Sequence, residues 1–406
     1  MTEIQFPLDE PAVTRRGHLQ RRLRRQRETA RRDAAIGAVI AALLVTTLDS
    51  GALLAVVAAS ADDAAPSELS QHGEADPSAD AVFTASMVGD LMFGRHVERV
   101  VERHGADALL ADVAPLLTGD YVSGNLEQVI SEQDDLPEAN KLIHLVSDRR
   151  AVDALVAAGF TTLSLANNHS MDHGIPGLRD TIEALDEAGL QHAGGGLDLA
   201  AAVETNYQEF GGLTVATLSF TDAYVQGFIA RAFQGGVLEA EPEVFIPLLQ
   251  QASQNADLVI ANFHWGEEYD FGPNRRQREL AEIAAAAGAD IIIGHHPHVV
   301  MPVERIGDTL VFYSLGNFVF DQGWSRTRES VIARYSLGED GMARVTLVPV
   351  YITEGTPRAV SGPLGVYRRE RIFQRLRGGD GIEWRREGDH LVADLDHRHV
   401  VEGVTP

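Results

Sequence analysis

The chain has 406 residues, enough for one large domain or two ordinary ones, and it is strongly acidic, with 59 Asp and Glu against 34 Lys and Arg. A net charge of −25 argues against nucleic-acid binding through general electrostatics. There is no cysteine, so disulfides and thiolate metal ligands are excluded, and any metal must be held by His, Asp, Glu or Asn.

The N-terminal residues have the composition of a membrane-targeting segment. Nine arginines fall within residues 1–33, against five acidic residues. An apolar run then covers residues 34–60, about the length of a membrane span, although Asp49 interrupts it. Arginines on the N-terminal side of such a run keep that side in the cytoplasm. We therefore predict a basic cytoplasmic leader (1–33) and a single-pass transmembrane signal anchor (34–60), which would hold the rest of the chain outside the cell, at the cell membrane.

A second interpretation of the apolar run is a signal peptide cut after Ala59-Ser60-Ala61, which fits the small-residue cleavage pattern. The long basic leader and the long apolar run favour the anchor, and the adjoining arginines disfavour a buried soluble helix. Residues 61–80 are rich in Ala, Asp, Ser and Pro, so we predict a flexible linker there. The folded domain is expected to begin near Ala81.

From this point strands, polar turns and helices alternate, which is typical of an α/β domain. Strands are predicted at 83–88, 121–123, 160–165, 213–220, 258–263, 291–293 and 309–313. Helices are predicted at 97–117, with a break at Gly105, and at 148–158, 175–188, 244–255 and 276–287. An antiparallel pair is predicted at 330–335 and 343–350, and the charged C-terminal residues are expected to include a helix near 369–377.

Five of the predicted strands are followed by residues that can bind metal. These residues are Asp90, Glu127, Asn168 with His169, His264, and His296 with His298. At any one strand such residues are ordinary turn formers, but open α/β sheets place their ligands beyond the carboxyl ends of the strands. Imidazole is also the commonest neutral metal ligand. The joint pattern therefore predicts a site for one or two divalent ions such as Mn, Fe, Zn or Mg.

Six segments together resemble the motif series of the CapA family. They read GDLM at 89–92, NLE at 125–127, ANNHSMDHG at 166–174, HWGEEY at 264–269, HHPHV at 295–299 and YSLGNFVFD at 313–321. Members of that family are poly-γ-glutamate capsule synthesis proteins with a calcineurin-like metallophosphoesterase fold. The resemblance covers roughly residues 81–365 and implies a four-layer α/β/β/α sandwich of the metallophosphoesterase type, with a two-metal site between the sheets. Residues 366–406 are then a charged C-terminal extension.

The resemblance also implies roles for individual residues. The implied metal ligands are Asp90, Glu127, Asn168, His264, His296 and His298. Among them Asp90 would bind the first metal and Glu127 would bridge the two. Asn168 and His264 would bind the second metal, and the two remaining histidines would complete the shells. His169 would protonate the leaving group or stabilise the transition state.

The sequence departs from the wider phosphoesterase pattern at two positions. Met92 stands where that pattern has a histidine, and the second motif offers Asn125 and Glu127 in place of an aspartate. His295 is the alternative to His296 as a ligand, although His296 keeps the His-x-His spacing with His298.

Six more residues near the motifs have two interpretations each. Glu267 and Glu268 either contact the substrate or a water at the metal, or lie on a solvated loop. Trp265 and Tyr269 form a substrate wall or pack in the core. Asn317 and Asp321 follow a strand end, so they either support the histidines or cap a loop.

Two functions from different classes follow. The first is a membrane-anchored, outward-facing, metal-dependent hydrolase that acts on a phosphoester or amide of an anionic polymer. The second is a non-catalytic subunit that binds such a polymer through its metals and helps to export or anchor it. In both, the expected partners are the polymer, the membrane through the N-terminal helix, and other membrane subunits of capsule synthesis, with no nucleic acid.

Overall fold

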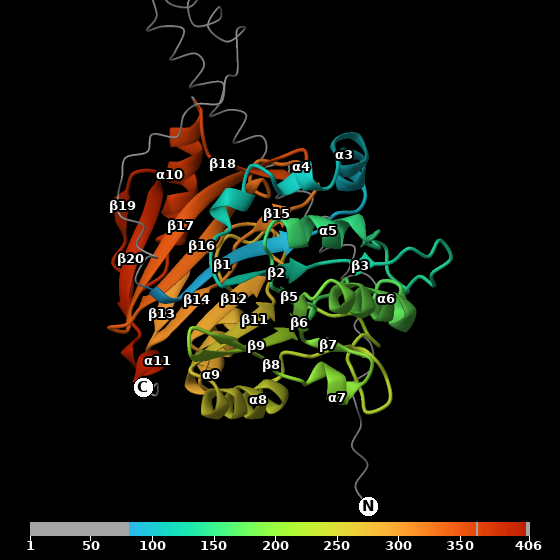
Figure 1. Ribbon diagram of the computed structural model, residues 1–406, viewed down its shortest axis with the longest axis horizontal. Helices are drawn as coiled ribbons and strands as arrows, with labels where there is room; N and C mark the ends of the chain where they lie inside the picture. The colour runs from blue at the N-terminus through green and yellow to red at the C-terminus, as the bar shows by residue number, and fades with distance from the viewer. Residues whose placement is uncertain (1–80, 363, 403–406) are drawn as a thin grey trace, which may run out of the picture. The chain divides into compact units, whose positions relative to one another are not determined.

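The computed structural model describes residues 81–362 and 364–402 of the chain (Figure 1). The predicted leader, signal anchor and linker, residues 1–80, lie outside this described part. Within it, every helix is too short or too polar to span a bilayer.

The larger of two main sheets has ten strands in the order β19-β20-β17-β16-β1-β2-β5-β6, with β15 paired to β1 and β18 to β17. Its strands are β1 (Ala81–Leu91), β2 (Tyr121–Leu126), β5 (Thr162–Ser164), β6 (Gln191–Ala193), β15 (Asn317–Val319), β16 (Glu329–Gly338), β17 (Met342–Thr353), β18 (Thr356–Ala359), β19 (Arg385–Glu387) and β20 (His390–Asp396). Strands β1, β2, β5 and β6 run parallel, so their carboxyl ends meet at one edge.

The smaller sheet has six strands in the order β13-β14-β12-β11-β9-β8. They are β8 (Asn206–Phe210), β9 (Leu213–Thr221), β11 (Leu258–His264), β12 (Ile291–His295), β13 (Val303–Ile306) and β14 (Thr309–Phe312). Strands β9, β11, β12 and β14 are parallel, as the apolar run at 291–293 predicts for a buried strand. Two short pairs, β3 (Val129–Ile130) with β4 (Val146–Ser147) and β7 (Gly195–Gly196) with β10 (Gly236–Val237), complete the described strands.

The two sheets pack face to face. Phe83 and Val331 of the larger sheet lie in one buried apolar cluster with Ile260 and Ile293 of the smaller sheet. The opposite face of each sheet is covered by helices (Figure 1). Those over the larger sheet are α3 (His96–His104), α4 (Asp107–Leu110), α5 (Arg150–Ala157) and α6 (Gly174–Glu187), and those over the smaller are α8 (Pro242–Asn255) and α9 (Arg275–Ala286). The layers therefore run helix, sheet, sheet, helix, and the predicted mixed α/β class is confirmed.

Several elements differ from the prediction in extent. The helix expected at 97–117 is divided into α3, α4 and a 3₁₀ turn, η1 (Ala114–Leu116), because Gly105 takes a positive φ of 85° and Pro115 begins the last turn. The helix predicted near 369–377 is present as α10 (Gly365–Leu376), whereas α11 (Arg398–Val401) and the strands β19 and β20, of which β20 pairs with β17, were not predicted. The charged C-terminal segment thus forms one edge of the larger sheet. Helix α7 (Leu199–Ala202) is one further short element.

Candidate metal centre

The strand registers bring the predicted site residues together. Asp90 and Asn125 pair at the carboxyl ends of the parallel strands β1 and β2, and Asp90 also pairs with Asn317, the first residue of β15. In the smaller sheet His264 on β11 pairs with His295 on β12. All five side chains are buried. The site is therefore built where the carboxyl edges of the two sheets face each other.

Two groups of buried side chains at this place have ligand atoms within 4.8 Å of one another. The first group is Glu127, His264 and His296, and the second is Asp90, Glu127 and His298. Glu127 Oε1 lies 3.9 Å from His264 Nε2 and 3.8 Å from His298 Nε2. The shared Glu127 carboxylate thus stands between the two groups, as a bridging ligand would.

The sixth predicted ligand, Asn168, joins the first group, because its Oδ1 lies 2.8 Å from His264 Nε2. His295 belongs to neither group. Its Nδ1 lies 3.4 Å from Asp90 Oδ1, and its Nε2 lies 3.4 Å from Asn262 Oδ1. The structure therefore groups His296 with the other candidate ligands and sets His295 beside Asp90.

The residues present fit a divalent ion. Glu127 Oε1 and His296 Nδ1 are buried, and neither has a hydrogen-bond partner within the described ranges. The separations of Glu127 Oε1 from the two imidazoles are too long for hydrogen bonds and near the roughly 3–3.5 Å between two ligand atoms that share one ion at about 2.1 Å each. Carboxylate, amide and imidazole donors suit Mn, Fe or Zn, so the donor set agrees with the sequence expectation.

Unusual backbone geometry occurs on both sides of the candidate centre. His296 and His298 have positive φ values of 92° and 58°, which non-glycine residues adopt at a cost. A Cβ on Gly294 would lie 2.1 Å from Tyr313 O, and one on Gly89 would lie 1.8 Å from Gly316 O. Only glycine allows these two close approaches, and each glycine directly precedes a site residue.

Charges at the centre shift the pKa values of its groups strongly. Burial raises the pKa of Asp90, but the neighbouring His295 and His298 imidazoles outweigh it, and the pKa lies well below its usual range. Burial lowers the pKa of His298, but the charges of Glu127 and Asp90 raise it to about 9. Burial and the Asp90 charge hold the pKa of Glu127 well above its usual value. In the metal-free protein the surrounding charges therefore do not fully stabilise Glu127 in its ionised form. A bound cation would stabilise that form.

The two other imidazoles are held neutral. Burial lowers the pKa of His296 to about 4, and burial with the neighbouring His296 charge holds the pKa of His264 well below its usual range. Neutral imidazole is the form that binds metal.

His169 lies next to the first group without being part of it. Its Nδ1 is 2.6 Å from Asp172 Oδ2, which also accepts a hydrogen bond from Leu145 N (2.7 Å). Burial lowers the pKa of His169, although the Asp172 hydrogen bond raises it in part. The imidazole is thus fixed by a carboxylate on one ring nitrogen, an arrangement suited to proton transfer at the other.

The remaining predicted residues lie in different places. Asn317 Oδ1 accepts a hydrogen bond from His298 Nδ1 (2.9 Å), because the Asn317 amide donates to Thr327 O (3.0 Å). Asp321 contacts Arg95 and is farther out, and Glu267 is exposed. Trp265 is buried, donates to Tyr313 O and stacks on Phe263, so it is a core residue.

Several residues at the centre had no role in the sequence-based prediction. Asn125 Nδ2 donates to Asp90 Oδ1 (2.9 Å), and its Oδ1 accepts from Asn167 Nδ2 (3.0 Å). Asn125 and Asn167 both lie inside motifs of the family resemblance, so that resemblance could have identified them from the sequence. Glu268, which has the same two interpretations as Glu267 in the sequence, is half-buried, and its negative charge adds to those that raise the pKa of His298. Lys141 and Asp172 also contact His169.

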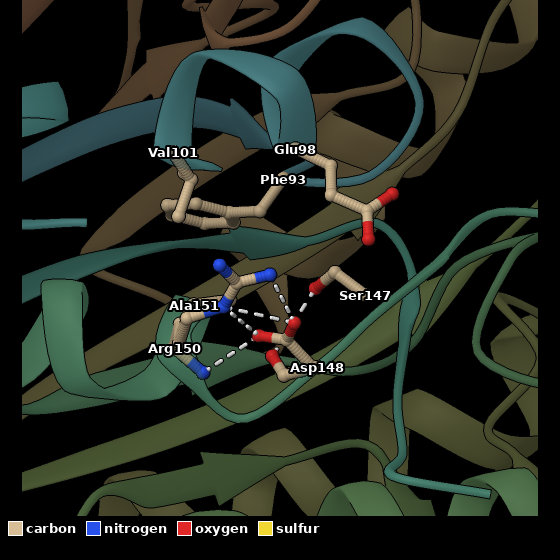
Figure 2. A pocket seen from close by; sticks show the side chains of 7 residues that line it. All are labelled: Phe93, Glu98, Val101, Ser147, Asp148, Arg150 and Ala151. Carbon is tan, nitrogen blue, oxygen red and sulfur yellow. Dashed lines mark hydrogen bonds and ion pairs between the residues drawn. The ribbon is translucent and has the colours of Figure 1, made fainter. Parts of the chain in front are cut away.

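A small pocket away from these groups lies between α3 and α5 (Figure 2). It has an empty volume of about 180 Å³ and is lined by Phe93, Glu98, Val101, Ser147, Asp148, Arg150 and Ala151. Its carboxylate Asp148 is bound by Arg150 through two guanidinium nitrogens. The pocket contains none of the candidate ligands and belongs to the outer helix layer.

Comparisons with known proteins agree on the family. Residues 84–322 match the family model of the bacterial capsule synthesis protein PGA_cap. The PGA biosynthesis protein CapA of Bacillus subtilis is 44% identical over 320 residues, which cover 78% of this chain and 84% of that protein. The capsule biosynthesis protein CapA of Bacillus anthracis is 44% identical over 329 residues, which cover 79% of each chain.

More distant similarities add less. A Mycobacterium tuberculosis relative named "Probable polyglutamine synthesis accessory protein" is 28% identical over 208 residues, which cover 48% of this chain and 54% of that protein. The solved structure of the Haemophilus influenzae NAD nucleotidase overlaps 57% of this chain and 49% of its own at 12% identity with a TM-score of 0.33, too low to support an argument. The family model and the two Bacillus relatives suffice, and this chain belongs to the PGA_cap family of bacterial capsule synthesis proteins.

Proposed function

We propose that this protein is a metal-dependent hydrolase of capsule biosynthesis, with a two-metal centre of the metallophosphoesterase type between its sheets. The observation that carries the proposal is the pair of buried carboxylate–imidazole groups that share Glu127. Asp90, Glu127 and His298 would hold one ion, and Glu127, Asn168, His264 and His296 would hold the other. When bound, divalent ions supply Lewis-acid polarisation and the activation of water.

The chain's own residues would orient the substrate and move a proton. Asp172 holds the His169 ring at Nδ1, so Nε2 is the nitrogen that would protonate the leaving group. Asn125 holds Asp90 in place through its amide, and Asn317 fixes the orientation of His298. Burial of the centre excludes bulk water and strengthens each of these interactions.

The substrate class we propose is a γ-glutamyl polymer, cleaved at an amide bond. Support comes from the Bacillus subtilis relative, which is named as a PGA biosynthesis protein. Such a polymer carries one carboxylate per residue, and two cations at the centre would offset the charge of a bound segment. A phosphoester is the other bond that two-metal centres of this kind cleave.

We further propose that residues 34–60 anchor the protein in the cell membrane and that the catalytic domain faces outward. The arginines at 1–33 support this orientation. Other membrane subunits of capsule synthesis are the partners that such a placement would bring within reach.

An accessory role without catalysis is the second candidate. Met92 takes the place of a histidine in the wider phosphoesterase pattern, and its side chain is fully buried in the apolar cluster beneath the outer helices. It therefore adds no ligand beside Asp90, which would weaken the first ion. The name of the Mycobacterium tuberculosis relative also refers to an accessory protein.

Elemental analysis combined with hydrolysis assays separates the two candidates. Full-length protein would be loaded with Mn²⁺, and its metal content would be measured together with cleavage of poly-γ-glutamate and of bis-p-nitrophenyl phosphate. We expect two ions per chain and cleavage of the polymer, and we expect His264→Ala to lose bound metal and thermal stability together. The control is His104→Ala, an exposed histidine on α3. At most one ion and no cleavage of either compound would favour the accessory role.

A further inference from the structure

Lysine is almost absent from this chain. Lys141 is the only one, against 33 arginines among the 34 basic residues. Wherever else the chain needs a cation, it uses the planar guanidinium of arginine. The ammonium of lysine differs from a guanidinium in being a compact charge with three donors that point in different directions.

The structure puts this lysine at the candidate centre, although it is far in sequence from every predicted site residue. The segment that joins β3 to β4 brings its ammonium to the turn that follows β5. Lys141 Nζ lies 2.6 Å from Asn168 O and 2.5 Å from Asp172 Oδ1. It is also 3.1 Å from His169 Nδ1, and only 12% of its side chain is exposed.

The three neighbours of Lys141 belong to one functional unit. Asn168 is a candidate metal ligand through its side chain, and Lys141 holds the backbone carbonyl of the same residue. Asp172 uses Oδ1 for Lys141 and Oδ2 for His169. Because the Asp172 carboxylate accepts the Nδ1 proton of His169, the ammonium beside that nitrogen is not its proton donor. Lys141 therefore fixes both the turn and the carboxylate that together set the His169 ring.

We infer that Lys141 is the positioning residue that aligns the Asn168–His169 turn with the metal centre. It acts through Asp172 and the Asn168 carbonyl and does not itself touch the reacting atoms. Arginine is not an equivalent replacement, because its guanidinium is larger and its donors lie in one plane, whereas the compact ammonium directs donors to a backbone carbonyl and a carboxylate in a nearly buried space. The alignment of the Asn168–His169 turn is a property of the fold and does not depend on the proposed function. The catalytic use of His169 does rest on the proposed function.

A purely structural role makes a different prediction. If Lys141 served only to neutralise the buried Asp172, removing both charges would undo the effect of removing one. If it also holds the Asn168 carbonyl, the double variant Lys141→Met/Asp172→Asn would remain more disturbed at His169 than Asp172→Asn alone. This comparison also keeps the test decisive if Lys141→Met by itself does not fold.

The experiment measures hydrogen–deuterium exchange at the ring C2 of each histidine by mass spectrometry, on full-length protein loaded with Mn²⁺. We expect faster exchange at His169 in Lys141→Met than in the wild type, and no change at the exposed His104. Arg150→Met is the matched control, because it also deprives an aspartate, Asp148, of its cation but lies in the outer helix layer.

Kinetics supply a second measurement. Loss of a residue that orients a catalytic group typically costs about 10–100-fold, so kcat on poly-γ-glutamate in saturating Mn²⁺ should fall by that factor while KM stays near the wild-type value. Unchanged exchange at His169 in Lys141→Met, or equal exchange in Asp172→Asn and the double variant, would overturn the inference. A wild type without hydrolase activity would remove the proposed function, yet the exchange comparison would still decide the role of Lys141.

Discussion

The shared carboxylate offers the sharpest test of the two-metal interpretation. Glu127→Gln keeps the size and shape of a fully buried side chain but removes its charge. In the metal-loaded protein the bridging carboxylate becomes a neutral amide, so both ions should bind more weakly. In the metal-free protein burial and the Asp90 charge raise the pKa of Glu127, so the ionised carboxylate opposes folding at neutral pH and its removal should not destabilise.

The expected size of the effect follows from mass action. An ion present at one hundred times its Kd stabilises the folded state by about 2.7 kcal/mol. For a domain of roughly 320 residues the unfolding entropy near the midpoint is about 0.7 kcal/mol per degree, so the loss of one ion should lower Tm by about 4 °C. Loss of both should lower it by about 8 °C. In EDTA the variant should melt at the wild-type temperature or above it.

The assay is differential scanning calorimetry of wild type and Glu127→Gln, each in saturating Mn²⁺ and in EDTA. Glu102→Gln is a suitable control, because Glu102 is an exposed glutamate on α3 and should give equal Tm values under both conditions. An equal drop of Tm with and without metal would refute the reasoning, since it would show that Glu127 serves the protein fold and not a bound ion.

Three further outcomes are expected. His169→Ala should lose turnover by about 10²–10⁴-fold and keep its metal, because no candidate ligand is removed; metal lost in proportion to activity would instead assign His169 to holding Asn168. Protease added to intact cells should digest the domain and spare residues 1–33, and full protection of the domain would contradict the outward orientation. His397 is buried, and burial lowers its pKa to about 4. The unfolded state binds a proton at His397 below about pH 6.5, whereas the folded state binds it only near pH 4. The free energy of unfolding should therefore fall by up to about 3 kcal/mol as the pH drops from 6.5 to 4. Denaturant titrations of His397→Gln across that range should show a smaller decline.

Much of the centre could be predicted from the sequence because strand ends are encoded locally. The run 291–293 stops at Gly294, and parallel strands bring their carboxyl ends to one edge, so Asp90, His264 and His298 could be expected to meet. The prediction that Glu127 bridges two ions came from the family resemblance, since nothing in the spacing of Glu127 distinguishes it from a turn residue, and the structure adds that Glu127 is shared by both ligand groups. The sequence does not show which of His295 and His296 lies near Glu127, because that depends on the backbone of the loop, where His296 takes a positive φ and its ring lies near Glu127.

The parts that could not be predicted lie in segments without periodicity. Lys141 is 28 residues from His169 and stands in an irregular connection, whose course depends on contacts that form only in the folded protein. Strand β8 has polar residues at most positions because it is an edge strand, so its pattern does not stand out from a loop. Strand β20 lies in the charged segment after α10, so the sequence predicts a C-terminal extension there. Its apolar residues Leu391 and Leu395 nevertheless pack between the two sheets.

The close backbone contacts at Gly89 and Gly294 have a consequence for how the family can vary. At each glycine an added methyl group would overlap a backbone oxygen. The residue that follows is Asp90 after Gly89 and His295 after Gly294. Real Cβ atoms essentially never come within 3.0 Å of such an oxygen, so replacing either glycine would force the two backbones apart by about an ångström. That shift would displace Asp90, a candidate ligand, or His295, which lies beside Asp90, while every candidate ligand is retained. Substitutions at the two glycines should therefore weaken metal binding, because a bound ion demands a defined ligand geometry.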